Sequence, residues 1–247
     1  MELKINKKYI HSIEDFIKTI SEENKDLIVD VHKSDEKKIY ESIILIKNYL
    51  EANEINKIFH LEMFNHSINH IIKINLTANN IENIPEIINS FTELKILILN
   101  NNKIQKISNL DKLMKLDKLE LRGNKITKVE GLDNLKNLTK LTLSCNLISN
   151  IEENDFPNID TLLELGLFGN YLGIENKKFE KNINDQNIEQ LKKFVGIIKN
   201  KFKGLKGLYI GGNFFTNLYD INENNINQNY KTIINSMIPG IIIDGQN

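Results

Sequence analysis

The sequence predicts an α/β fold of the solenoid type, in which short parallel strands stack into one sheet and return segments close each coil. Three observations predict it. An apolar motif recurs along the chain, and its first four copies start at residues 71, 94, 116 and 138, a period of 22 or 23 residues. An asparagine holds a fixed place in each copy. Between copies, apolar residues recur at every third position, as in 3₁₀ turns.

The motif reads L-x-x-L-x-L-x-x-N-x-I, with isoleucine replacing leucine at some positions. The first four copies are Ile71/Ile74/Leu76/Asn79/Ile81, Leu94/Leu97/Leu99/Asn102/Ile104, Leu116/Leu119/Leu121/Asn124/Ile126 and Leu138/Leu141/Leu143/Asn146/Ile148. Agreement at five positions in consecutive units resembles the leucine-rich repeat, whose period is about 20–29 residues. The resemblance implies a curved right-handed horseshoe with its parallel sheet on the concave face. The short period and thin returns resemble the intracellular subclass that includes the phosphatase-1 regulator and the tubulin-folding cofactors.

We expect the motif asparagines to form a ladder through the stack. A side-chain amide carries an acceptor and two donors, so it can satisfy backbone groups that a tight turn buries. The ladder residues are Asn79, Asn102, Asn124, Asn146, Asn170 and Asn213.

The fifth and sixth copies start at residues 162 and 205, and the segment between them is too long for a thin return. Apolar residues at helical spacing predict an α-helix there, from residue 185 or 187 to 202. A second helical crossover is predicted over residues 225–236, because Pro239-Gly240 follows as a stop signal. Residues 238–247 form the predicted terminal cap repeat, with Gln246 where the asparagine would stand.

The first 56 residues lack the repeat and predict a helical capping segment, with helices over residues 13–20 and 35–51. A cap shields the apolar core that the first coil would expose. The alternative is a separate effector helix pair. Residues 26–32 alternate in the strand sense but are too few to assign. Residues 57–70 predict a hairpin cap whose second strand is the first strand of the solenoid, so the solenoid domain spans residues 57–247.

Composition narrows the function classes. A chain of 247 residues, 40% of them hydrophobic, can bury a sizeable core. The formal net charge of −1 gives no basic field for nucleic acid or an anionic membrane surface. No apolar run reaches the roughly 18–20 residues of a membrane helix. The single cysteine, Cys145, excludes an internal disulfide. Without cysteine-rich caps, we expect a cytoplasmic, reducing location.

The concave sheet is the customary binding surface of such solenoids. Strand periodicity predicts which side chains face outward there. The candidate contact residues are Lys73, Asn75, Ile98, Asn100, Lys118, Glu120, Arg122, Lys140, Thr142, Glu164, Phe168 and Tyr209. Early repeats present mixed charge, whereas later ones present Phe168 and Tyr209 beside glycines, which favours an aromatic anchor site. Singly exposed apolar residues are also ordinary on protein surfaces.

Catalytic and metal motifs are weak. All five histidines lie within the first 70 residues, and His60, Glu62, His66 and His70 have ligand types that suit zinc but match no metal motif. Polar turn residues explain them better. Cys145 has no histidine in its repeat to act as a base. Gly211-Gly212-Asn213 lacks the spacing of a phosphate loop. We therefore expect no cofactor.

The leading hypothesis is a non-enzymatic scaffold, itself a monomer, that binds another protein on its concave face. The alternative is a regulatory subunit of a phosphatase- or GTPase-type enzyme, as the subclass resemblance would imply. A metal-dependent activity built from the N-terminal histidines ranks third.

Overall fold

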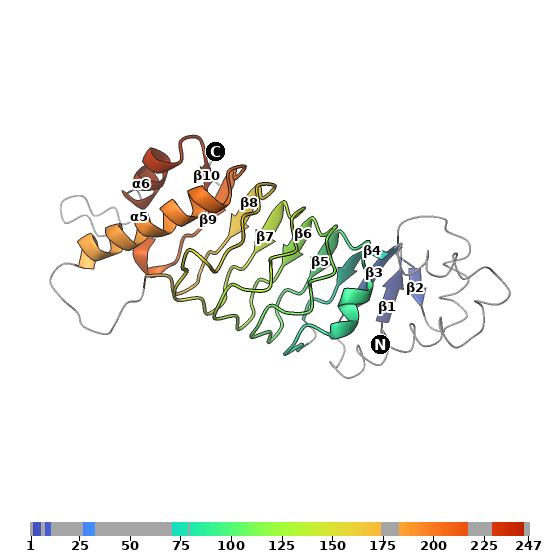
Figure 1. Cartoon of the computed structure of the whole chain (residues 1–247). Coiled ribbons are helices and arrows are strands. Elements are labelled where there is room, and N and C mark those ends of the chain that lie inside the picture. Colours follow the sequence, from blue (N-terminus) through green and yellow to red (C-terminus); the bar gives the residue numbers. More distant parts are fainter. Residues whose placement is uncertain are drawn as a thin grey trace.

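The computed structural model describes residues 2–5, 8–10, 27–32, 71–78, 80–173, 183–216 and 229–244. Ten strands of these residues form one sheet, in the order β10-β9-β8-β7-β6-β5-β4-β3-β1-β2 (Figure 1). The strands from β3 to β10 pair in parallel, each with its neighbour along the chain. The motif strands are β4 (Ile71–Asn75), β5 (Ile96–Ile98), β6 (Lys118–Glu120), β7 (Lys140–Thr142), β8 (Glu164–Gly166) and β9 (Gly207–Tyr209). The predicted solenoid is confirmed.

Each coil contributes its apolar motif positions to one continuous core. Leu97, Leu119, Leu141 and Leu165 occupy the centres of successive strands and are fully buried. Burying one such side chain stabilises the fold by about 1.5–3 kcal/mol. Because each coil rests on the next, the core runs along the whole stack instead of filling a sphere.

The returns follow the predicted three-residue step. The N–H of Leu113 donates to the carbonyl of Leu110, and the N–H of Leu116 donates to that of Leu113. All three side chains are buried. These i to i+3 bonds are of the 3₁₀ type, and the first return holds a 3₁₀ helix, η1 (Glu86–Ser90).

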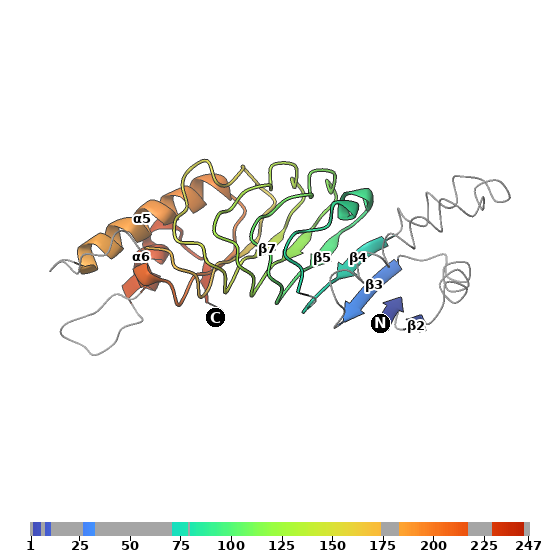
Figure 2. The same cartoon turned by 90° about the horizontal axis from the view of Figure 1, so that it is seen from below.

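Two crossovers near the C-terminus are α-helices, as predicted. They are α5 (Ile183–Lys201) and α6 (Asn229–Met237). Helix α5 packs against α6 and against η2 (Phe214–Thr216), and Figure 2 shows both helices at the end of the row of strands. Phe202, just after α5, meets Phe156 of an earlier return edge to face, with ring centroids 5.0 Å apart. The chain then adds β10 (Ile242–Ile243) beside β9.

The N-terminal end of the sheet differs from expectation. Strand β3 (Leu27–His32), the run that was too short to assign, pairs in parallel with β4. Strand β1 (Glu2–Ile5) lies between β3 and β2 (Lys8–Ile10), antiparallel to both. The predicted helices 13–20 and 35–51 and the hairpin segment 57–70 lie outside the described residues. Among the described strands, β3 and β5 are the two neighbours of β4 in the sheet.

Candidate functional site

The asparagine ladder fixes where each concave strand ends. Asn124 donates from Nδ2 to the carbonyls of Leu99 and Leu121, at 3.0 and 2.9 Å, and its Oδ1 accepts from the N–H of Ile104 at 3.0 Å. Equivalent bonds are made by Asn102, Asn146, Asn170 and Asn213. Asn79, the remaining predicted member, lies outside the described residues.

The residue before each ladder asparagine adopts a left-handed backbone. Its φ lies between 56° and 72° at Asn101, Gly123, Cys145, Gly169 and Gly212. Glycine takes this conformation without steric cost, and asparagine tolerates it better than most residues do. Cys145 therefore occupies a turn position of the repeat, where its half-buried thiol lies near Gly169.

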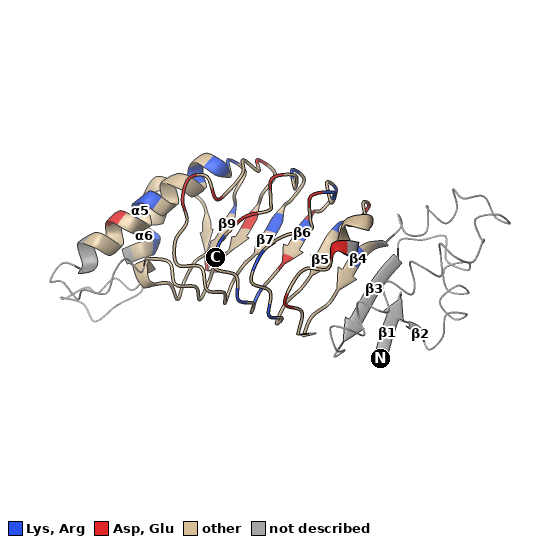
Figure 3. Ribbon diagram, turned by 60° about the horizontal axis from the view of Figure 1, so that its bottom comes forward, with Lys and Arg blue, Asp and Glu red and all other residues tan. Residues whose placement is uncertain are grey.

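Outward side chains of the sheet form three rows that cross the strands. The first row is Lys73, Ile96, Lys118, Lys140, Glu164 and Gly207, and the second is Asn75, Ile98, Glu120, Thr142, Gly166 and Tyr209. The third row, just past the strands, is Asn100, Arg122, Ser144, Phe168 and Gly211. All twelve predicted contact residues lie in these rows at the concave surface. Figure 3 shows acidic and basic residues intermingled over this part of the chain.

A pocket of about 360 Å³ opens on the concave face over β7, β8 and β9. It brings together six predicted residues: Arg122, Lys140, Thr142, Glu164, Phe168 and Tyr209. Ser144, Gly166 and Asp244 complete its lining. The other six predicted residues lie on the same sheet but outside the pocket. They are Lys73, Asn75, Ile98, Asn100, Lys118 and Glu120.

Glycines shape the pocket. Gly166 lines it and carries no side chain in the second row between Thr142 and Tyr209. The space directly at Gly166 is narrow, because a Cβ built there would lie 3.1 Å from Oγ of Ser144. In the third row Gly211 lets the ring of Phe168 lie close above it, because a Cβ there would be 3.3 Å from that ring. Phe168 remains 48% exposed, so its ring forms an aromatic wall that is open to solvent.

Most of the charges around the pocket are already partnered. Lys140 forms an ion pair with Glu164 at 2.9 Å, and the hydrogen bond to Glu164 raises the pKa of Lys140. Oδ1 of Asp244 accepts from the N–H groups of Ile210 and Gly211, at 2.8 and 2.9 Å. Its Oδ2 accepts from the hydroxyl of Tyr230. Burial, and secondly this bond, raise the pKa of Tyr230.

A second exposed apolar feature was missed by the sequence reasoning. The position after the ladder asparagine is lysine in two early repeats, Lys103 and Lys125, and then becomes Leu147, Tyr171 and Phe214. These three side chains are 42–44% exposed, and the rings of Tyr171 and Phe214 stack with centroids 6.2 Å apart. We call Leu147, Tyr171 and Phe214 the apolar ridge. The switch from lysine to apolar residues was visible in the sequence.

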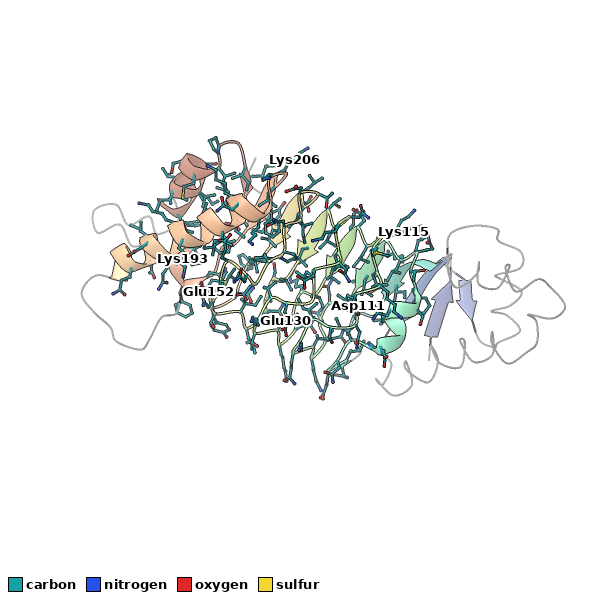
Figure 4. All side chains as sticks on the ribbon, in the orientation of Figure 1. Asp111, Lys115, Glu130, Glu152, Lys193 and Lys206 are labelled. Atoms are coloured by element: carbon teal, nitrogen blue, oxygen red, sulfur yellow. The ribbon has the colours of Figure 1, made fainter. Side chains whose placement is uncertain are left out.

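The surface away from the concave sheet carries ion pairs that join neighbouring elements. Figure 4 labels Lys193 of α5 and Glu152 of a return, which form an ion pair at 3.2 Å. Asp111, also labelled, accepts from Nδ2 of Asn89 one coil earlier at 2.8 Å. That hydrogen bond is the first cause of a lowered pKa at Asp111. Exposed pairs of this kind stabilise by about 0–1 kcal/mol each.

The described residues contain no group of three or more metal-ligating side chains. His60, Glu62, His66 and His70 lie outside the described residues. No helix in the described part of the chain is long and apolar enough to cross a membrane.

Comparisons with known proteins agree with this architecture. A family model described as leucine rich repeats (2 copies) matches residues 115–158. No curated protein matches the chain. Among solved structures, an internalin (inlF) from Listeria monocytogenes is 23% identical with a TM-score of 0.50. The match covers 74% of this chain and 44% of the internalin, so the chain spans less than half of that protein's length, and the likeness concerns the fold alone.

The family match lies on the coils that carry β6 and β7, where the asparagine ladder and buried leucines are most regular. The structural match extends the same architecture over most of the chain. Neither match reports which subclass of repeat is present. Motif, ladder, sheet and comparisons agree that the chain folds as a leucine-rich repeat solenoid.

Proposed function

We propose that the chain is a non-enzymatic scaffold that binds a protein partner on the concave face, at the pocket over β7, β8 and β9. The observation that carries the proposal is the exposed ring of Phe168 in the wall of the pocket. Solvent-exposed aromatic rings next to a cavity are typical anchor points of protein interfaces. The fold adds support, because solenoids use their extended concave surface for binding.

The surroundings of the pocket also suit a protein ligand. Charged and polar side chains, among them Arg122, Lys140 and Glu164, lie around the aromatic wall. Interfaces commonly have an apolar centre inside a polar rim. Early coils of the same sheet extend this surface with Lys118, Glu120 and further polar residues, so a partner can contact several coils at once.

Affinity capture from the native lysate tests this function. The baits are the wild-type chain, a Phe168→Asp/Tyr209→Asp variant and a Tyr171→Asp/Phe214→Asp variant on the apolar ridge. All three must first unfold at the same temperature, so that lost binding reports lost surface. We expect a partner that is held by the wild type and by the ridge variant and is lost by the pocket variant.

A partner kept by the pocket variant would contradict the proposed site. If that partner were lost by the ridge variant, recognition would belong to the ridge. A captured phosphatase or GTPase whose activity changes with added chain would favour the regulatory-subunit alternative over a passive scaffold.

A further inference from the structure

One cation in the pocket has no partner. Among the described residues, the guanidinium of Arg122 forms no ion pair and no side-chain hydrogen bond. Arg122 is exposed and lines the pocket. It is also the only arginine of the sequence. A guanidinium presents a planar fork of donors that matches a carboxylate.

The other charged groups of the pocket have partners. Glu164 is held by Lys140 at 2.9 Å. Asp244 accepts from two backbone N–H groups and from the hydroxyl of Tyr230, so both of its oxygens are used. The charged group of the pocket that can still pair with a ligand is therefore the positive guanidinium of Arg122.

One pocket reaches from Arg122 to the aromatic wall, since both line it. In the third row Ser144 lies between Arg122 and Phe168, and its side chain is small. Gly166 lines the same pocket. Arg122 and Phe168 are two strands apart, which corresponds to about 10 Å at the usual strand spacing. An extended peptide covers that distance in about three residues.

We propose that the pocket binds an extended peptide segment of the partner that carries a carboxylate about three residues from an aromatic or large aliphatic side chain. The carboxylate pairs with the fork of Arg122. The apolar side chain enters the pocket beside Gly166, against Phe168 and Tyr209. This inference deepens the proposed function and rests on it.

A carboxylate suits this place better than a phosphate. Glu164 and Asp244 line the same pocket and repel a dianion more strongly than a monoanion. Among the described residues that line the pocket, one cation, Arg122, is unpaired, whereas phosphate sites usually combine several basic groups. The apolar ridge has no comparable charge pattern, and nothing in the structure indicates what covers it.

A displayed library of random linear dodecapeptides, selected on the immobilised full chain, tests the inference. We expect enriched peptides to share an Asp or Glu about three residues from Phe, Tyr, Trp, Leu or Met. The affinities of these peptides are then measured for the Arg122→Gln and Gly166→Thr variants. Gly166→Thr puts a side chain into the pocket, and threonine is the residue at the equivalent position of the preceding strand, Thr142. Matched controls are Lys125→Gln and Met114→Thr, which change exposed residues outside the three concave rows.

Arg122→Gln should weaken the enriched peptides about tenfold or more, the effect of losing a charge-assisted hydrogen bond. Gly166→Thr should weaken them similarly, whereas both controls should bind as the wild type does. Replacing the acidic residue of a selected peptide by its amide should weaken binding to the wild-type chain as much as Arg122→Gln weakens binding of the unchanged peptide. The same replacement should not weaken binding to the Arg122→Gln variant any further. A phosphoserine at the acidic position should bind no better than the carboxylate.

Three outcomes would each overturn the inference. The enriched peptides could lack an acidic residue, Arg122→Gln could bind them as tightly as the wild type does, or Gly166→Thr could bind them as tightly as the wild type does. These outcomes are separable from failure of the proposed function. If Phe168→Asp/Tyr209→Asp still loses the natural partner while Arg122→Gln keeps it, the concave site stands and the carboxylate specificity is wrong. If the pocket variant keeps the natural partner, the proposed site itself fails.

Discussion

The side-chain oxygen of Asn146 accepts a hydrogen bond, 3.0 Å long, from the backbone N–H of Ile126 in the preceding coil. The same amide donates to the carbonyls of Leu121 and Leu143, at 2.9 and 3.0 Å. Asn146 is 2% exposed, so water does not compete for these groups. One side chain thus links two coils and closes its own turn, and the coil interfaces are stabilised by polar contacts as well as by leucines.

Replacing a central rung should destabilise the stack strongly. Asn124→Leu would leave the N–H of Ile104 without its acceptor. It would also remove one of the two side-chain donors to each of the carbonyls of Leu99 and Leu121, which keep their bonds from Asn102 and Asn146. A buried N–H without a partner costs about 1–3 kcal/mol and each further lost hydrogen bond about 0.5–1.5 kcal/mol, so we expect a loss of about 2 kcal/mol or more in the free energy of unfolding. Urea unfolding monitored by circular dichroism measures it. Asn137→Ala, which removes an exposed amide bond to Met114, is the control and should cost below about 1 kcal/mol. Equal midpoints for the two variants would refute the structural role of the ladder.

Replacing each of two glycines by alanine should change the free energy of unfolding in opposite directions. Gly131 has φ of 69°, and a Cβ there would lie 2.5 Å from the carbonyl oxygen of Ile107. Gly131→Ala should cost about 1–2 kcal/mol from the left-handed backbone alone. Gly196 lies within α5, where a Cβ meets nothing within 4 Å. Gly196→Ala should therefore gain about 0.5–1 kcal/mol from helix propensity. Thermal unfolding of both variants checks the prediction, and a stabilising Gly131→Ala would show that the return has a different backbone.

The bond between Tyr230 and Asp244 should make stability depend on alkaline pH. Burial and the bond raise the pKa of Tyr230 above its ordinary value of 10.0, so the folded state favours the neutral phenol. Its contribution is complete below about pH 10, the ordinary value, and is lost as pH rises through the raised folded pKa. Tyr230→Phe should cost about 1 kcal/mol at pH 7.

Chemical denaturation of the wild type and Tyr230→Phe between pH 8 and pH 12 isolates this group, because the lysines titrate alike in both chains. The difference in unfolding free energy should shrink above about pH 10. A difference that stays constant would mean that Tyr230 is not the group whose ionisation is coupled to folding.

The repeats were predictable because each buried position recurs in the sequence. Leu110, Leu113 and Leu116 follow a three-residue step, and that step alone predicts the 3₁₀-type returns. The α5 crossover was predictable for a similar reason, since its apolar stripe includes Leu191, Val195 and Ile198, all buried.

The ends of the sheet were harder to predict because they depend on pairing between distant segments. No local pattern indicates that Val29 pairs with Ile74. Asp244 was missed at the site because its partners Ile210 and Tyr230 lie 34 and 14 residues away in sequence. The concave rows were predicted by strand periodicity, whereas the pocket arises from where Gly166 falls between its neighbours on β7 and β9.

Photo-crosslinking tests the concave site most directly. A photoreactive residue replaces Thr142, which lines the pocket, or Met114, which is 64% exposed on a return far from it in the repeat. Each bait is irradiated in the native lysate after both are shown to unfold at the same temperature. Binding in the pocket predicts a covalent adduct from position 142 that is absent from position 114 and is competed away by unlabelled wild-type chain. An adduct from position 114 with none from position 142 would contradict recognition on the concave face.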